Sequence, residues 1–348
     1  MVNIAIIGNS KCGKTDLASI FGKKGTDSDI TFFNTRKQNK EYIFIDPKTY
    51  PKTLKSLITA ITLSDIIIFC ISIDNIDLYT GECILALDIL KKKNGVIVIT
   101  KTDMTYNENI QNFSKKIKSI IKGTIIENWN ILPINTNKNC KNSFFGIDNL
   151  QNEIQKLSSI IEKEIHNYSL KKKRVIIDHY FNVTGIGLVI LGKVYQGIVK
   201  THDKLMLYPI NKKVEIRSIQ RNDINIKEAI PGDRVGIGIK GISEKEIERG
   251  FILSEEEFTS NKIKILFTLS KYSKEINEKD SVYFFLGLQS GIITIEKIEN
   301  KNNKENNIIL ICNLNKKISY SYDDNIILVN LNIEKKQRFI GIGKIIPI

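Results

Sequence analysis

The sequence predicts an α/β domain followed by two all-β barrel domains. Short apolar segments alternate with helix-periodic segments from residue 1 to about 165. A loop with two glycines and two lysines, residues 8–15, separates the first apolar segment from the first helical pattern. After residue 175 only short strands punctuated by glycine and charged turns follow. The first pattern is typical of a mostly parallel sheet covered on both faces, and the second is typical of barrels or sandwiches.

The elements of the first domain follow from the spacing of apolar residues. The segments that predict buried strands are residues 4–7, 42–45, 66–72, 96–99 and 131–134. The segments with helical periodicity are residues 54–63, 83–92, 110–121 and 150–165. Because ligands of such sheets bind at the carboxyl ends of the strands, we look for functional residues there.

The second half contains no convincing helix of ten residues. Its first predicted strands are residues 176–183, 188–195, 204–208, 214–220 and 234–240, and about six more follow. Residues 166–174 are polar and basic, which suits a linker, and residues 300–307 are read as a polar loop. The predicted domains are therefore 1–165, 175–258 and 259–348, with the linker at 166–174 and a break near 257–261.

Composition restricts the class of partner and the compartment. The chain of 348 residues has 52 Lys and Arg against 38 Asp and Glu, a formal net charge of +14. RNA is one explanation of this excess, and a genome biased toward Lys, Ile and Asn codons is another. An odd number of cysteines without a C-x-x-C pair favours a reducing cytosol over disulfides or zinc. The longest apolar stretch is too short for a membrane span and the N-terminus predicts no signal peptide, so we expect a cytoplasmic protein.

Residues 8–15 match the pattern G-x-x-x-x-G-K-[ST] in its strand–loop–helix setting. Backbone N–H groups of such a loop surround a β-phosphate, helped by the positive end of the following helix. Lys14 is expected to reach the β- and γ-phosphate oxygens, and Thr15 to hold Mg²⁺. A nucleoside triphosphate or diphosphate is the expected ligand.

Two further polar positions close predicted strands. Asp46 follows the strand 42–45 and is expected to be a second carboxylate near Mg²⁺. Lys101 and Asp103 belong to the sequence T-K-x-D after the strand 96–99. A carboxylate at Asp103 can accept guanine N1–H and N2–H, which adenine does not offer, while the Lys101 stem lies along the base. A helix N-cap is the other interpretation of Asp103, and the two roles are compatible.

With these residues the chain resembles the translational GTPases, and among them elongation factor Tu and the selenocysteine-specific elongation factor. Residues 46–59 align without gaps on the family's D-x-P-G-H segment and its following helix. Residues 100–103 stand where the family has N-K-x-D, and Asn135 and Thr136 stand at its S-A base contact. Residues 181–194 look like the second-domain run F-x-V-x-G-x-G-T-V-V-x-G-x-V. Further similarity is at residues 217–220, 231–236, 240–241, 249–250 and 338–343.

The resemblance implies a GTPase-like domain and two β-barrels, GTP or GDP with Mg²⁺ as cofactors, and tRNA and the ribosome as partners. DNA and membranes are not expected partners, and a monomer is expected. The metal ligands are then Thr15 and Asp46. The nucleotide-binding residues are Gly8, Asn9, Ser10, Lys11, Cys12, Gly13, Lys14, Thr15, Asp46, Thr100, Lys101, Asp103, Asn135 and Thr136.

The chain departs from the family at the residues that sense and hydrolyse triphosphate. Thr49 replaces a glycine whose N–H meets the γ-phosphate, and a side chain there resists the backbone change of that loop. Tyr50 replaces the histidine that positions the attacking water, and a phenol is a poor proton acceptor at neutral pH. Lys11 replaces an acidic residue of the family, and Thr100 replaces the Asn that braces the base-binding loop.

The effector region is also short, because only 32 positions separate Lys14 from Asp46. Thr26, Thr31 and Thr35 are the candidates for its magnesium-binding threonine. No catalytic residue is assigned, and none of the three histidines is expected to be catalytic.

Three hypotheses stay open: a divergent elongation factor, a pseudo-GTPase that binds RNA or protein, and another phosphate-loop enzyme. The similarity in the second domain disfavours the third.

Overall fold

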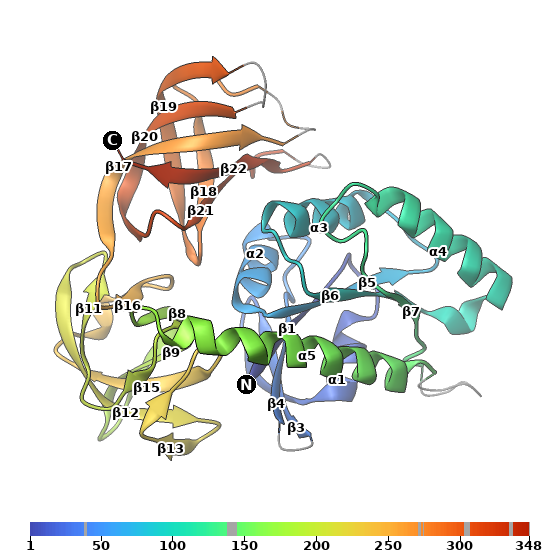
Figure 1. Ribbon diagram of the computed structural model, residues 1–348, viewed down its shortest axis with the longest axis horizontal. Helices are drawn as coiled ribbons and strands as arrows, with labels where there is room; N and C mark the ends of the chain where they lie inside the picture. Colours follow the sequence, from blue (N-terminus) through green and yellow to red (C-terminus); the bar gives the residue numbers. More distant parts are fainter. Residues whose placement is uncertain are drawn as a thin grey trace. The chain divides into compact units, whose positions relative to one another are not determined.

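The computed structural model confirms the predicted fold class, an α/β domain followed by two β-barrels (Figure 1). It describes residues 1–37, 40–137, 145–270, 273, 275–302, 307–333 and 337–347. The chain divides into two compact units, Met1–Lys163 and Glu164–Ile348. The first unit contains the sheet with its helices, and the second contains both barrels.

The first unit is built on a seven-stranded sheet with the order β2-β3-β4-β1-β5-β6-β7. Its parallel strands are β1 (Val2–Ile7), β4 (Lys40–Asp46), β5 (Ile66–Ser72), β6 (Gly95–Thr100) and β7 (Ile131–Pro133). Every residue of β1, β5 and β6 is buried, as expected for strands covered on both faces. Two strands are not among those predicted, β2 (Lys23–Asp27) and β3 (Thr31–Lys37), which pair antiparallel beside β4.

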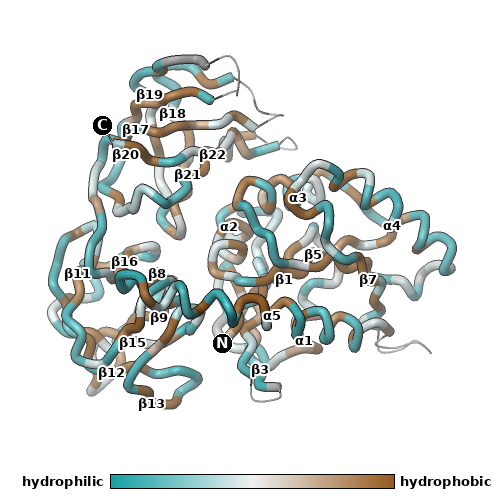
Figure 2. Tube along the Cα trace, viewed as in Figure 1, coloured by the Kyte–Doolittle hydropathy of each residue, from teal (hydrophilic) through white to brown (hydrophobic). Residues whose placement is uncertain are grey.

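The helices of this unit are α1 (Lys14–Phe21), α2 (Leu54–Leu63), α3 (Leu78–Ile89), α4 (Asn107–Ile121) and most of α5 (Ile147–Ser169). Leu17 of α1 and Leu150 of α5 share one core with Ile4 and Ile6 of β1. Hydrophobic residues dominate β5, whereas α4 alternates between hydrophobic and hydrophilic positions (Figure 2). In α2, eight of its ten residues are buried (Leu54, Ser56, Leu57, Ile58, Thr59, Ala60, Ile61 and Leu63).

Helix α3 shows why predicted boundaries shift. It begins at Leu78, five residues before the predicted start, because Asp77 caps it and accepts a hydrogen bond from the backbone N–H of Thr80 at 2.9 Å. It ends at Ile89 rather than 92, and Lys91 adopts a left-handed backbone with φ 51° that no helix continues through.

The second unit contains two closed barrels. The first has the strand order β11-β16-β8-β9-β15-β12, and pairing of β11 with β12 closes the ring. These strands are β8 (Arg174–Val183), β9 (Gly187–Gln196), β11 (Lys204–Tyr208), β12 (Lys212–Arg221), β15 (Arg234–Lys240) and β16 (Ile252–Ser254). The smaller elements β13 (Ile224–Ile226), β10 (Val199–Lys200), β14 (Glu228–Ala229) and the 3₁₀ turn η2 (Glu244–Glu246) complete it.

The second barrel has the order β17-β20-β19-β18-β21-β22. Its strands are β17 (Phe258–Leu269), β18 (Ser281–Leu286), β19 (Gln289–Asn302), β20 (Asn307–Tyr320), β21 (Asn325–Val329) and β22 (Phe339–Ile346). Each barrel has its own apolar core. In the described part of 175–348 the chain forms no α-helix, as the sequence predicts.

Three features of the sequence lie near the boundaries of these elements. Helix α5 ends at Ser169 and β8 begins at Arg174, so the first four residues of the expected linker 166–174 are helical. The strands β19 and β20 reach into the polar tract 300–307, whose residues 303–306 lie outside the described residues. No described helix is long and apolar enough to cross a membrane.

The cysteines that the structure describes are all free and buried: Cys12, Cys70, Cys83 and Cys312. The fifth, Cys140, lies outside the described residues.

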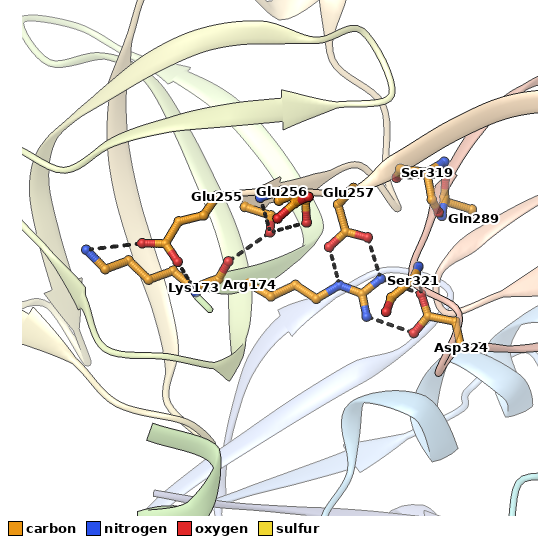
Figure 3. A network of polar contacts seen from close by, with 10 residues as sticks. Lys173, Arg174, Glu255, Glu256, Glu257, Gln289, Ser319, Ser321 and Asp324 are labelled. Atoms are coloured by element: carbon orange, nitrogen blue, oxygen red, sulfur yellow. Dashed lines mark hydrogen bonds and ion pairs between the residues drawn. The ribbon is translucent and has the colours of Figure 1, made fainter. Parts of the chain in front are cut away.

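A buried ion-pair network joins the two barrels within the second unit (Figure 3). Arg174 opens β8, Glu257 lies just before β17, and Asp324 lies just before β21. The Arg174 Nε lies 2.7 Å from Glu257 Oε1, and its Nη1 donates to Asp324 Oδ1 at 2.7 Å. The side chains of Arg174 and Glu257 are only 6% and 2% exposed. Removing the guanidinium alone therefore leaves two carboxylates in a poorly solvated place.

The raised pKa of Glu257 makes the stability of the fold depend on pH. Burial raises its pKa to about 7 from an ordinary 4.5, Asp324 adds to the increase, and Arg174 opposes it. Between pH 4.5 and about pH 7, Glu257 is therefore protonated in the folded chain and ionised in the unfolded chain. The contribution of Glu257 to the free energy of unfolding has its maximum below pH 4.5 and is lost as the pH rises through about 7.

We expect the wild type to gain about 1–2 kcal/mol over Glu257→Gln as the pH falls from about 7.5 to about 5.5. Urea unfolding followed by far-UV circular dichroism measures this difference, and Glu257→Gln is the matched control because it differs from the wild type only at this carboxyl. Parallel pH profiles of the two proteins contradict the assignment.

Candidate nucleotide-binding site

The phosphate loop connects β1 to α1, and its backbone conformation needs its glycines. Gly13 has a left-handed backbone with φ 84° immediately before α1. A Cβ at Gly8 would lie 2.3 Å from the backbone oxygen of Cys70 in β5. No side chain fits there, because the loop passes directly over the neighbouring strand. Ser10 and Lys11 lie on the exposed side of the loop.

Lys14 and its neighbours fill the inside of the loop. The Lys14 ammonium is buried and donates to the backbone oxygen of Asn9 at 2.5 Å. Asn9 is buried and its Nδ2 donates to Asp77 Oδ2 at 3.1 Å. Cys12 is fully buried, and burial raises the pKa of its thiol, so the thiol stays protonated at neutral pH. The lysine is held against a carbonyl oxygen that a phosphate oxygen can replace as its acceptor.

The two proposed metal ligands lie together. Thr15 Oγ1 donates to Asp46 Oδ2 at 2.7 Å, although the residues come from α1 and the end of β4. Asp46 is 1% exposed, and its Oδ1 has no hydrogen-bond partner among the described residues. Burial raises the pKa of this carboxyl, while Thr15, Lys14 and Lys48 act against the increase. A hydroxyl and a carboxylate with a free oxygen fit Mg²⁺, which prefers oxygen ligands.

The effector region is a hairpin of β2 and β3. Thr31 is paired with Asp46 across β3 and β4, whereas Thr35 is paired with Tyr42, toward the opposite end of β4. Of these two magnesium-ligand candidates, only Thr31 is therefore beside the phosphate loop, and its Oγ1 donates to Asp27 Oδ1 at 2.7 Å. Thr26 lies in β2.

Tyr50 is directed into the interior of the unit. It is 3% exposed, and its hydroxyl lies 3.0 Å from both the backbone oxygen of Tyr79 and Glu82 Oε1, two acceptors that share its one proton. The Cys83 thiol donates to the same hydroxyl at 3.5 Å. Burial raises the pKa of Tyr50, which removes it further from use as a base. Thr49 instead contacts the effector hairpin, since its N–H donates to the backbone oxygen of Asp29 at 3.4 Å.

Thr100 braces the phosphate loop from the end of β6. It is fully buried, and its Oγ1 donates to the backbone oxygen of Cys12 at 2.8 Å. A threonine at this position thus makes a direct link between the T-K-x-D segment and the phosphate loop. Lys101 follows in a left-handed conformation with φ 58°, and its ammonium pairs with Asp74 at 3.1 Å.

A cavity of about 440 Å³ lies beside the start of α1. Its lining residues are Asp16, Ser19, Ile20, Lys101, Asp103, Thr136 and Asn137. Asp103 lies in the 3₁₀ turn η1 (Thr102–Met104) and accepts a hydrogen bond from Asn137 Nδ2 at 2.9 Å. Asn135 is buried and supports the loop, because its Oδ1 accepts from the N–H of Asn137 at 2.8 Å.

Sequence reasoning missed several residues of this site. Asp27 and Lys48 lie 3.0 Å apart beside the Thr15–Asp46 pair, and Asn137 contacts Asp103. No spacing rule identifies Asp27, which belongs to a strand that the sequence does not predict. Lys48 could have been noticed as a cation two residues after Asp46.

Comparison with known proteins gives a consistent set of relatives. The family model described as elongation factor Tu domain 2 matches residues 187–254. An uncharacterized protein of Methanocaldococcus jannaschii is 33% identical, over 93% of this chain and 94% of its own length. The selenocysteine-specific elongation factor of the same organism is 28% identical, over 99% of this chain and 79% of its own length.

Solved structures agree with the sequence relatives. Translation elongation factor SelB from Methanococcus maripaludis, in complex with the GTP analogue GppNHp, aligns with 99% of this chain and 79% of that chain. The TM-score is 0.83 and the sequence identity is 26%.

Proposed function

Because the chain belongs to the translational GTPases of the SelB and elongation factor Tu type, we propose that it binds guanine nucleotide with Mg²⁺ at the phosphate loop. The observation that carries the proposal is the Thr15–Asp46 hydrogen bond of 2.7 Å, with a buried carboxylate oxygen left for a cation. Burying the unpaired Asp46 oxygen costs free energy, and a bound cation would offset that cost.

In the proposed complex the loop N–H groups and Lys14 bind the phosphates, and Thr15 and Asp46 hold Mg²⁺. The metal ion neutralises phosphate charge when it is bound. Lys14 exchanges the Asn9 carbonyl oxygen for phosphate oxygens, which are charged acceptors and therefore stronger ones. The cavity lined by Lys101, Asp103 and Thr136 takes the base.

Hydrolysis by this site is proposed to be slow. The residue at the family's histidine position, Tyr50, has its hydroxyl hydrogen-bonded to Tyr79 and Glu82 in the interior. No side chain assigned to the site is a base for water, so rate acceleration rests on Lys14 and Mg²⁺ alone. A partner that supplies the missing group would then control turnover.

A pseudo-GTPase is the second candidate function, and the position of Tyr50 favours it. In this case nucleotide is held statically, and the barrels bind RNA or protein. The two candidates share the nucleotide site and differ in turnover.

The proposed partners are aminoacyl-tRNA and the ribosome, in the cytoplasm. Similarity of residues 187–254 to elongation factor Tu domain 2 and the net charge of +14 support an RNA partner.

Nucleotide selectivity tests the base assignment. We expect ATP to bind at least about a hundredfold more weakly than GTP, because adenine leaves Asp103 without its two donors. Asp103→Asn should shift the preference toward xanthine nucleotides, which present a carbonyl in place of the guanine amino group. Isothermal titration of both proteins measures this, and equal ATP and GTP affinities for the wild type rule out the guanine assignment.

Turnover separates the two candidate functions. We expect very slow intrinsic GTP hydrolysis, and Tyr50→Phe should change the rate by less than about twofold because the buried hydroxyl is no base. Phosphate release in single-turnover reactions gives the rate. Restoring the family residues, Thr49→Gly with Tyr50→His, should raise it if the hairpin can close. Fast hydrolysis by the wild type without a partner contradicts the slow-hydrolysis proposal.

The carrier role is tested with tRNA. Affinity should fall steeply with salt, because each neutralised phosphate releases counterion, and charged tRNA should bind more tightly than uncharged tRNA at every salt. A merely basic surface produces the same salt dependence without the preference. Filter binding across a salt series decides this, and equal affinities exclude the carrier role.

A further inference from the structure

Asp27 of the effector hairpin holds two lysines from different segments. Its carboxylate is 2.7 Å from the ammonium of Lys24 in β2 and 3.0 Å from that of Lys48, in the loop after β4. Thr31 Oγ1 donates to it at 2.7 Å. The hydrogen bonds from Lys24, Thr31 and Lys48 lower the pKa of Asp27, so the carboxylate is charged at neutral pH.

Lys48 lies next to the proposed metal ligands. Its backbone N–H donates to the backbone oxygen of Asp46 at 2.9 Å. Thr31, which binds the same Asp27 carboxylate, is the β3 partner of Asp46. Asp46 is influenced electrostatically by Lys14, Asp27 and Lys48 together. Lys48 is therefore a second cation on the side of the site where Asp46 and Thr15 lie.

Lys48 and Thr49 also hold the turn of the effector hairpin. The Lys48 ammonium binds Asp27 before the turn, and the Thr49 N–H donates to the backbone oxygen of Asp29 within it at 3.4 Å. Two consecutive residues after Asp46 thus hold residues 27–29. A displacement of Lys48 weakens this attachment.

We propose that Lys48 senses the terminal phosphate of bound guanosine triphosphate: its ammonium leaves Asp27 for that phosphate and so loosens the turn 28–30. The inference rests on the proposed nucleotide binding and adds a residue that distinguishes triphosphate from diphosphate.

The Lys48–Asp27 pair is suited to such an exchange. The two side chains are 54% and 30% exposed, and ion pairs in such solvated positions are weak. A terminal phosphate carries more charge than one carboxylate, and lysine binds phosphate as a point charge. Lys24 can stay on Asp27 after Lys48 leaves, so the carboxylate keeps a partner. A diphosphate lacks the γ-phosphate that would compete for Lys48, so Lys48 remains on Asp27.

The experiment compares GTP and GDP affinities, with Mg²⁺, in the full-length wild type and four variants. Lys48→Ala and Lys48→Gln should each weaken GTP binding about tenfold and change GDP binding less than about twofold. Asp27→Asn should strengthen GTP binding, by about threefold, because it frees Lys48. Lys24→Ala is the matched control: it removes the other partner of Asp27 at the same 54% exposure, and should leave the GTP-to-GDP ratio within about twofold.

The opposite signs for the Lys48 and Asp27 variants identify the exchange. If both weaken GTP binding, or if Lys48→Ala leaves the GTP-to-GDP ratio unchanged, the pair only holds the hairpin and the inference is wrong. If the wild type binds neither GDP nor GTP, the proposed function fails as well. GDP affinity within the expected range shows that each variant is folded at the site.

Hydrogen exchange provides a second readout. In the wild type, amides of residues 28–30 should exchange faster with GTP than with GDP. This difference should disappear in Lys48→Ala. Equal exchange with both nucleotides in the wild type overturns the inference.

Discussion

Parallel pairing of β1 with β4 and β5 is the constraint on which the site depends. It brings the carboxyl ends of strands that are far apart in the sequence to one edge, where Ala5 lies opposite Ile45 and Ile7 opposite Phe69. Gly8 consequently lies over β5, and Thr15 of α1 meets Asp46 at the end of β4. Pairing of β6 with β5 adds Thr100, whose hydroxyl reaches the phosphate loop. The Thr15–Asp46 and Thr100–Cys12 hydrogen bonds then hold together the strand ends that the sheet has aligned.

Tyr50 fixes the position of the segment that follows Asp46. A tyrosine at position 50 has its ring buried against α3, and its hydroxyl satisfies polar groups of that helix. These contacts hold the segment after Asp46 in one position. Moving the segment would remove the Tyr50 hydroxyl from the Tyr79 carbonyl and the Glu82 carboxyl, which is costly for buried polar groups. The part before Tyr50 contacts the effector hairpin. That part contains Lys48 and Thr49, which contact Asp27 and Asp29.

The barrels depend on a different kind of interaction. Each barrel closes around its own apolar core, and a closed barrel has no edge left for pairing with the other. Side chains therefore make the contact between the barrels, and the Arg174 guanidinium donates hydrogen bonds to both Glu257 and Asp324 (Figure 3). Buried charge of this kind favours one arrangement, since any other leaves a carboxylate without its partner.

The sequence by itself determined the class of fold and indicated most residues of the candidate nucleotide site. Apolar runs of the right length predicted β1, β4, β5, β6 and β7, because strands buried on both faces need continuous apolar residues. The α2 boundaries were predicted as observed, and α3 began earlier because its cap lies outside the periodic region. Local chemistry also indicated Lys14, Thr15, Asp46 and Asp103, since each occupies a fixed offset from a strand end.

Only the tertiary structure decided the rest. The strands β2 and β3 were not predicted because β2 is largely polar and β3 has only Phe32 and Phe33 as apolar residues. Pairing of β3 with β4, and of β2 with β3, makes them strands. Burial of Tyr50 depends on the position of α3, and the Asp27–Lys48 pair joins residues that are distant in the chain. Such contacts are made between separate elements, and a local pattern carries no information about which elements will meet.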